Sequence, residues 1–561
     1  MAEEQRSVLL ESAAQFPVPH GVTLSYGTAG FRAEASKLSS TLFRAGIIAA
    51  LRSLKTGCTV GLMITASHNP VGDNGVKIAD PDGSMMAQSW EPFAEALANA
   101  ETPECLVELV FQFVKEEGIT FGGERPAEVL LGRDTRPTGE ALLEVSKQGI
   151  KAIIGVVPLD MGIVTTPQLH WMVWRKNKGL NALELDYFMQ LSESFRCLIE
   201  MVPEGITKQN FDLRLIVDGA NGVGGMKLEQ LKELLTGQEI QVRNACKQGL
   251  GVLNERVGAD YVQKEKVAPC GFGPNDIGLR CASFDGDADR LVYFRISRVN
   301  INSVDLVDGD KILSLFALFI KEQLHMLNSG IKDLKNALPA SLGIVQTAYA
   351  NGASTDYLKQ LGLEVVFTPT GVKYLHKKAA EYDIGIYFEA NGHGTILFSE
   401  DFLSKLQEKK NYFAASSAGS DPLKACLRLL AVSSLINQAV GDAISGLLLV
   451  EAVLQYMGWT VQNWIELYHD LPSRQLKVKV ADRTAVITTD AETQVLRPFG
   501  LQEAIDAETA KYDRARCFIR PSGTEDVIRV YAEASYQEAA DSLAQSVSQH
   551  VDRFLGLQSL K

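Results

Sequence analysis

The chain has 561 residues, of which 46% are hydrophobic and 22% are charged. This is the composition of a globular protein of about three or four domains, and it excludes a disordered or fibrous chain. Acidic residues outnumber basic ones by 68 to 55, and the net charge of −13 argues against a nucleic-acid partner, which would select a basic surface.

The eight cysteines form no CxxC pair and are few for the length of the chain. This argues against a disulfide framework or a zinc module and predicts a reducing compartment. The N-terminus lacks an uninterrupted apolar signal segment, and the most apolar stretches are too short or too interrupted to span a bilayer. We therefore expect a cytoplasmic protein that does not bind membranes.

Short apolar runs of strand type recur along the chain, and each ends in a loop rich in Gly, Asp, Asn or Ser. The runs cover residues 59–64, 129–131, 213–217, 281–284 and 384–388. Helical spacing of apolar residues lies between them, as in Lys311–Leu324. Alternating strands and helices predict α/β domains with partly parallel sheets, whose ligands gather at the carboxyl ends of strands.

Composition shifts near residue 190, at 297–305 and at 471–473 mark likely boundaries, and we expect domains over residues 1–190, 191–300, 301–455 and 456–561. The charged, Ser-rich stretch 400–423 is expected to be an exposed insertion. The last domain should close with a helix, because Ser535 and Glu538 fit a capping box and apolar residues repeat behind them at helical spacing.

The first loop, TASHNP (residues 65–70), follows the strand-type run 59–64. It can be a plain turn, in which Ser and Asn bond their own backbone and Pro stops the strand. It can also present Ser67 as a nucleophilic or phosphorylated serine, with His68 beside it and Lys77 close in sequence.

The loops at 132–139 (GRDTRPTG) and 218–225 (DGANGVGG) follow in the same way, and then comes DGDADR (residues 285–290). Its three carboxylates repel one another in so short a loop, and a cation would relieve that repulsion. Arg290 and Ile296 stand at the sixth and twelfth positions, which excludes an EF-hand. The few carboxylates predict a Mg²⁺ site; the alternative is a solvated acidic turn.

Two further loops could bind a ligand. EANGHGT (residues 389–395) offers Glu and Asn for sugar hydroxyls and glycines for close approach, with Lys373 just upstream. RPSGTED (residues 520–526) and Arg529 combine backbone amides, hydroxyls and guanidinium groups, which are the parts of a phosphate cradle. The alternative for the second loop is a turn flanked by an ion pair such as Arg529 with Glu525.

In this order along one chain, the loops are highly specific. The sequence resembles the α-D-phosphohexomutase superfamily, and within it the eukaryotic phosphoacetylglucosamine mutases, from YGTAGFR (residues 26–32) to RPSGTEDVIRVYAEA (residues 520–534). EANGHGT is the cue for this branch. The resemblance implies an α/β architecture of four domains around a central cleft, in which three α/β domains with mixed sheets are followed by a smaller C-terminal α+β domain.

The resemblance also implies a role for each loop. Ser67 matches the phosphoserine, and Asp285, Asp287 and Asp289 match the ligands of one Mg²⁺, completed by a phosphate oxygen on Ser67. Arg32, His68, Lys77 and Arg290 fall around the transferring phosphate. The residues implied to bind substrate are Arg290, Lys373, Glu389, Ala390, Asn391, His393, Arg520, Pro521, Ser522, Gly523, Thr524 and Arg529.

The implied activity is that of an intramolecular phosphotransferase, an isomerase that interconverts N-acetylglucosamine 6-phosphate and N-acetylglucosamine 1-phosphate in UDP-N-acetylglucosamine biosynthesis. A hexose 1,6-bisphosphate would serve as intermediate and primer, and Lys77, His68 and His393 are the candidate general bases. Alternatives are a mutase for glucose or mannose phosphates, a phosphatase, and a non-catalytic sugar-phosphate sensor. We expect a small-molecule sugar phosphate as partner, no nucleic acid or membrane, and a monomer.

Overall fold

The computed structural model describes residues 2–123, 126–203, 212–246, 251–298, 300, 303–329, 337–416, 419–522 and 526–556. The chain forms two compact units, each with its own sheets. Unit 1 comprises Met1–Asp308, Asn391–Thr395 and Leu430–Thr460, and unit 2 comprises Gly309–Ala390, Ile396–Leu429 and Val461–Lys561. The backbone therefore passes between the units more than once.

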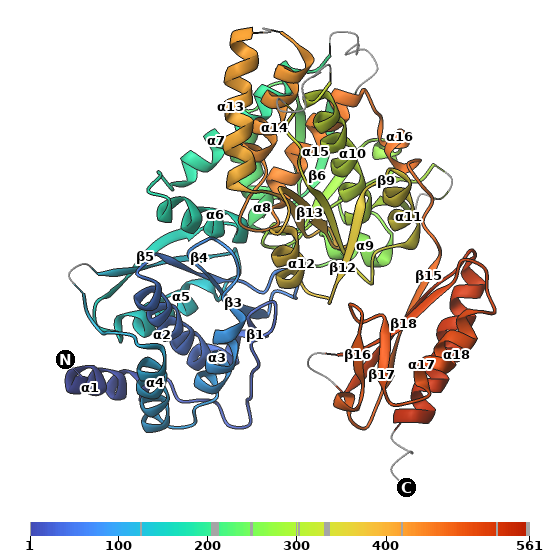
Figure 1. The fold of residues 1–561 in the computed structure, drawn as a ribbon. Coiled ribbons are helices and arrows are strands. Elements are labelled where there is room, and N and C mark those ends of the chain that lie inside the picture. Colours follow the sequence, from blue (N-terminus) through green and yellow to red (C-terminus); the bar gives the residue numbers. More distant parts are fainter. Residues whose placement is uncertain are drawn as a thin grey trace. The chain divides into compact units, whose positions relative to one another are not determined.

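The first sheet of unit 1 supports TASHNP (residues 65–70), the serine loop, which connects two of its strands. Its strands are β1 (Phe31–Glu34), β2 (Val60–Ile64), β3 (Asp73–Ala79), β4 (Ala127–Arg133) and β5 (Val156–Ile163). Their order is β1-β3-β2-β4-β5 (Figure 1). Strands β2, β4 and β5 are parallel, whereas β3 is antiparallel to β1 and β2. All of β2 is buried, as befits an inner strand with a continuous apolar sequence.

Helices α2 (Ser39–Thr56) and α5 (Gly139–Lys151) pack on one face of this sheet and α6 (Thr166–Asn177) packs on the other. Helices α1 (Ala2–Ala13), α3 (Glu91–Ala98), α4 (Pro103–Glu117) and α7 (Glu184–Glu200) pack against other helices. Helices α2 and α5 approach closely because glycines face each other: a Cβ on Gly149 would lie 1.9 Å from the Phe43 carbonyl oxygen. Gly61 of β2 similarly admits the side chains of α6 on the other face.

The second sheet of unit 1 supports DGDADR (residues 285–290), the acidic loop. Its strands are β6 (Arg214–Asp218), β7 (Glu239–Arg243), β8 (Cys281–Phe284), β9 (Leu291–Ile296) and β10 (Val304–Val307), in the order β10-β9-β8-β6-β7. Its helices are α8 (Val223–Leu231), α9 (Ala259–Glu265) and α15 (Ala443–Met457). Strand β8 is fully buried, as the sequence predicts, and DGDADR connects it to the antiparallel β9.

A third sheet consists of strands β11 (Leu342–Thr347), β12 (Glu364–Thr368), β13 (Ile384–Phe388) and β14 (Gly394–Phe398), in the order β12-β11-β13-β14. Strands β12, β11 and β13 are parallel. The helices of this region are α10 (Gly309–Leu327), α11 (Gly352–Gln360), α12 (Val372–Ala379), α13 (Glu400–Ser416), α14 (Asp421–Leu435) and α16 (Val461–Ile465). Helix α10 confirms the helix predicted over Lys311–Leu324.

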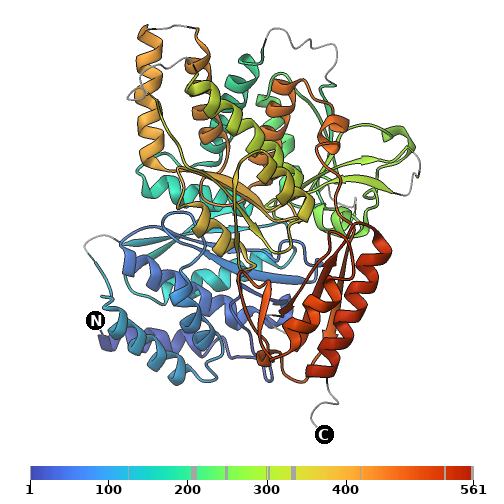
Figure 2. The same cartoon turned by 45° about the vertical axis from the view of Figure 1, so that its right-hand side comes forward.

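A smaller α+β region ends the chain. Strands β15 (Ser473–Lys479), β18 (Arg516–Pro521) and β19 (Val527–Glu533) form an antiparallel sheet in the order β15-β19-β18. Strands β16 (Ile487–Thr489) and β17 (Gln494–Arg497) form a hairpin. Helices α17 (Leu501–Thr509) and α18 (Gln537–Leu555) cover one face of the sheet, where Leu543 and Val547 pack with Ile528 and Val530 (Figure 2).

One expectation about local structure is wrong. Helix α18 starts at Gln537 with Tyr536 as its N-cap and no side-chain cap, so Ser535 lies one residue too early for the predicted capping box. Residues 400–416 are mostly exposed, as predicted, but they form helix α13, which buries Phe402, Leu406 and Phe413 at helical spacing.

The four-domain division stays a prediction. Residues 190 and 455, placed at predicted boundaries, lie inside α7 and α15, so a cut there would break a helix.

Candidate active site

Ser67 lies in the loop after β2, at the carboxyl end of the strand, as the sequence predicts. Its side chain is buried, and its Oγ donates a hydrogen bond of 2.6 Å to Asp285 Oδ2. Its backbone φ of 49° is unusual for a residue other than glycine. The hydroxyl is therefore held against the acidic loop and does not serve a simple turn.

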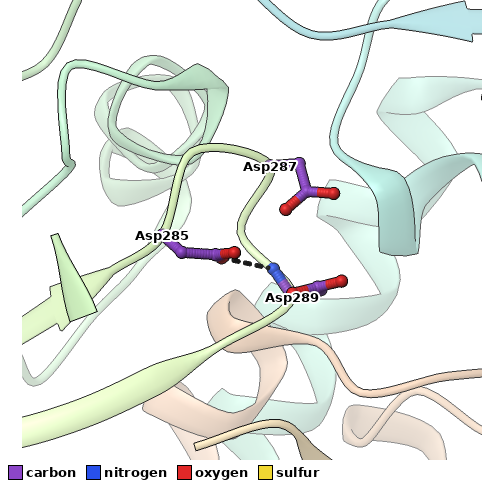
Figure 3. Close-up of side chains that lie close together, drawn as sticks. All are labelled: Asp285, Asp287 and Asp289. Carbon is purple, nitrogen blue, oxygen red and sulfur yellow. Dashed lines mark hydrogen bonds between the residues drawn. The ribbon is translucent and has the colours of Figure 1, made fainter. Parts of the chain in front are cut away.

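Asp285, Asp287 and Asp289 converge within the loop between β8 and β9 (Figure 3). All three are buried, and one carboxylate oxygen from each lies within 4.8 Å of the others. The loop folds back on itself, because the Asp289 amide donates to Asp285 Oδ1 at 3.0 Å. A buried set of three like charges rules out a solvated acidic turn.

The surroundings shift the pKa values of Asp285 and Asp289 in opposite directions. Burial, together with the neighbouring Asp289 and Asp287 charges, raises the pKa of Asp285 well above its usual value. Burial also opposes the charge of Asp289, but Lys77 offsets it and holds the pKa of Asp289 well below the usual value. Lys77 Nζ lies 3.2 Å from both Asp287 Oδ2 and Asp289 Oδ2.

The donor set fits a small divalent cation. Among the described residues, Asp287 Oδ1 and Asp289 Oδ1 are buried without a hydrogen-bond partner. The other oxygen of Asp287 is taken: Oδ2 accepts from Thr166 Oγ1 at 2.6 Å and from Lys77. One oxygen of Asp287 is thus fixed by protein and the other is left for a metal, and so few carboxylates suit Mg²⁺. Asp285, Asp287, Asp289 and phospho-Ser67 would hold it.

The other residues predicted around the transferring phosphate lie near these two loops. Arg290 pairs with Asp260, and Arg32 donates to Asn69 Oδ1 at 3.3 Å. His68 Nδ1 lies 3.4 Å from Ser67 Oγ. Burial, and then the Arg290 charge, lowers the pKa of His68 to about 4, so this imidazole is neutral near pH 7.

His393 belongs to EANGHGT (residues 389–395), the predicted sugar loop, yet its ring faces the acidic loop. Its Nδ1 lies 2.9 Å from the Asp289 carbonyl oxygen, which can only accept, so Nδ1 carries a proton. Asn391 Oδ1 accepts from the His393 amide at 2.9 Å. Both residues belong to unit 1, whereas Glu389 and Ala390 belong to unit 2 and are half-buried.

The predicted phosphate cradle lies in unit 2. Arg520 and Arg529 are paired across β18 and β19, and the Ser522 amide donates to the Val527 carbonyl at 2.8 Å. Gly523 and Thr524 lie outside the described residues. Pro521 ends β18.

Glu492 adds a contact that sequence reasoning missed. Its Oε1 accepts from Arg520 Nε at 3.0 Å, and its Oε2 accepts from the amide and the hydroxyl of Thr370 at 2.9 and 2.5 Å. This carboxylate contacts Nε of Arg520 and thereby orients the guanidinium group. Burial lowers the pKa of Lys373, three residues beyond Thr370, to about 8.

Comparisons with known proteins agree with this geometry. Residues 180–292 and 308–459 match the models "phosphoacetylglucosamine mutase AMG1, domain II" and "domain III". Residues 45–105 and 476–550 match domain I and the C-terminal domain of phosphoglucomutase/phosphomannomutase. The chain is 63% identical to the phosphoacetylglucosamine mutase of Oryza sativa, with 96% of this chain and 95% of the relative covered. The chain belongs to the phosphoacetylglucosamine mutase family.

Other members of the family show the same likeness. The human phosphoacetylglucosamine mutase is 44% identical over 96% of this chain and 95% of its own. The crystal structure of Aspergillus fumigatus N-acetylphosphoglucosamine mutase in complex with GlcNAc-6P and magnesium matches with a TM-score of 0.88 at 41% identity, over 98% of each chain. The resemblance to the phosphohexomutase fold predicted from the sequence is thereby confirmed.

Thr166 should matter for metal binding in this family member. Thr166→Val removes the hydrogen bond that fixes Asp287 Oδ2, so we expect the affinity for Mg²⁺ to fall by about 10–100-fold, the usual effect of losing a partner behind a metal ligand. Titration calorimetry with Mg²⁺ measures it. Thr166→Ser keeps the hydroxyl and should keep the affinity; equal Mg²⁺ affinities in Thr166→Val and the unchanged protein would contradict the assignment.

Proposed function

We propose that this chain interconverts N-acetylglucosamine 6-phosphate and N-acetylglucosamine 1-phosphate, with phospho-Ser67 as donor and a hexose 1,6-bisphosphate as intermediate. The observation that carries the assignment is the buried contact of 2.6 Å between Ser67 Oγ and Asp285 Oδ2. It brings the only serine of the TASHNP loop to the metal ligands, in a chain of this family. A non-catalytic sensor would not need a serine hydroxyl in contact with a cluster of metal-binding carboxylates.

Phosphoryl transfer needs positioning and charge neutralisation more than covalent chemistry. When bound, Mg²⁺ supplies a concentrated positive charge for the transferring phosphoryl group. Lys77 holds Asp287 and Asp289 in place and adds a positive charge beside them, and Arg32 and Arg290 lie near the same loops. Phospho-Ser67 donates its phosphoryl group to the free sugar hydroxyl, and the opposite phosphate later returns to Ser67.

The proton of the attacking hydroxyl needs an acceptor, and the three candidates differ in geometry. Lys77 Nζ is engaged with two carboxylates, and His393 Nδ1 is engaged with the Asp289 carbonyl. His68 presents a ring nitrogen 3.4 Å from Ser67 Oγ. We propose that one of these three side chains is the general base.

The two remaining predicted loops offer groups for the parts of the substrate that do not react. Arg520 and Arg529 would bind the non-transferring phosphate, since paired guanidinium groups suit phosphate oxygens. Glu389 and Asn391 would bond the sugar hydroxyls, and Lys373 would add a charge near an anionic group.

We further propose that the protein acts in the cytoplasm as a monomer, without nucleic acid or membrane partners. All eight cysteines are free, which suits a reducing compartment. None of the helices within the described ranges combines the length and apolarity that a membrane span requires. The net charge of −13 disfavours binding to a polyanion.

The phosphoserine mechanism predicts that label from ³²P-glucose 1,6-bisphosphate appears on a Ser67 peptide and leaves it when N-acetylglucosamine 6-phosphate is added. Ser67→Ala should lose nearly all mutase activity, because no donor remains, while it still binds the sugar phosphate in a calorimetric titration. Label on another residue, or full activity of Ser67→Ala, would overturn the mechanism. A panel of glucose, mannose and N-acetylglucosamine phosphates separates the competing mutase activities.

The pH dependence of substrate binding should report Lys373. Because its folded pKa is about 8, Lys373 is charged below that pH and loses its charge above it. We therefore expect KM to rise as the pH increases through about 8, while Lys373→Arg, which stays charged, should keep a flat KM over pH 7–9. Initial-rate measurements at fixed ionic strength check this, and a rise of the same size in both proteins would exclude Lys373.

A further inference from the structure

The loop GRDTRPTG after β4 has a buried arginine at its centre. The Arg136 side chain is fully buried, and each of its five guanidinium N–H groups has an acceptor. These acceptors are Asp134 Oδ2 at 3.1 Å and the carbonyl oxygens of Pro70, Asp73, Ser67 and Asn69 at 2.5, 2.8, 3.0 and 2.9 Å. Four of the five are backbone atoms of the serine loop and of the start of β3.

A second side chain reaches two of the same carbonyls. Asn254 Nδ2 donates to the Ser67 carbonyl at 2.8 Å and to the Asn69 carbonyl at 3.0 Å. The acidic loop closes the third side: a Cβ on Gly286 would lie 2.5 Å from the Ser67 carbonyl oxygen. The carbonyl of Ser67 is thus enclosed by Arg136, Asn254 and Gly286.

The amide of Ser67 is tied to the same network. It donates to Thr65 Oγ1 at 2.9 Å, and that hydroxyl donates to Asp134 Oδ2 at 2.7 Å. Both backbone groups of Ser67 are therefore fixed, directly or through one residue, by the Arg136–Asp134 pair. Such fixation is what a serine with a φ of 49° requires, because that backbone conformation persists only where its surroundings enforce it.

We propose that Arg136 and Asn254 are positioning residues for phosphoryl transfer. Clamping the carbonyls of Ser67 and Asn69 holds Ser67 in its left-handed conformation and thereby aims Oγ at Asp285 and the metal site. The inference rests on the proposed role of Ser67. It goes beyond that role because neither residue touches the reacting atoms, and the clamp sets the rate of transfer without setting the affinity for the sugar phosphate.

The molecule offers matched controls for a purely structural contribution. Asn177 Nδ2 also donates to two backbone carbonyls, those of Thr59 and Pro81, at 2.7 and 2.8 Å. Arg44 is also a buried arginine whose guanidinium donates to backbone carbonyls, those of Phe16, Ser40 and Ala100. Both lie in unit 1 and make no contact with the serine loop in the structure described.

The test compares Asn254→Ala with Asn177→Ala, and Arg136→Lys with Arg44→Lys. We expect Asn254→Ala and Arg136→Lys to lower kcat by about 10–100-fold, the scale of a misplaced reacting group, with KM within about threefold of the unchanged enzyme. The melting temperatures should fall equally within each pair, and both control variants should keep kcat. The rate at which ³²P-glucose 1,6-bisphosphate labels Ser67 should fall in step with kcat.

If Asn254→Ala keeps the kcat of Asn177→Ala, or if it changes KM in place of kcat, the clamp is refuted. Should Arg136→Lys not fold, Asn254→Ala decides alone, because Asn254 is only half-buried. Failure of the underlying mechanism is recognised separately, since the unchanged enzyme would then carry no label on Ser67.

Discussion

The site depends on the burial of three carboxylates within one short loop. Asp285, Asp287 and Asp289 would repel one another strongly in so dry a place, and a buried charge without a partner is costly. Lys77 offsets part of this repulsion by pairing with Oδ2 of Asp287 and Oδ2 of Asp289. Oδ1 of each of these two residues has no hydrogen-bond partner among the described residues and is left for a cation. The contacts that stabilise this loop therefore also leave carboxylate oxygens available to bind Mg²⁺.

The serine loop and the acidic loop hold each other. Gly286 leaves room for the Ser67 carbonyl, and Ser67 Oγ in turn donates to Asp285. Because each loop follows a buried strand, β2 and β8, the Ser67 hydroxyl and the Asp285 carboxylate meet at the carboxyl ends of strands from two different sheets. The sugar loop differs, since the chain passes from unit 2 to unit 1 between Ala390 and Asn391.

Much of this was predictable from the sequence. Strand-type runs before Gly- and Asp-rich loops locate the sheets. The DGDADR carboxylates form the buried cluster that the sequence suggests, and their role as metal ligands stays a prediction. The contacts of Thr166 with Asp287, of Glu492 with Thr370 and of Arg136 with the serine loop were missed for a common reason. Each joins residues more than 60 positions apart, and those of Arg136 reach backbone carbonyls that leave no trace in the sequence. Helix α13 was missed because charged residues outnumber the three buried apolar ones that decide its position.

The central claim is that the phosphate on Ser67 and the metal share one site. The ³¹P NMR signal of phospho-Ser67, followed while paramagnetic Mn²⁺ is added in place of Mg²⁺, tests it most directly. We predict that one equivalent of Mn²⁺ broadens the signal beyond detection and that excess Mg²⁺ restores it. A signal that stays sharp while Mn²⁺ binds to the protein would place the metal away from Ser67 and contradict the account.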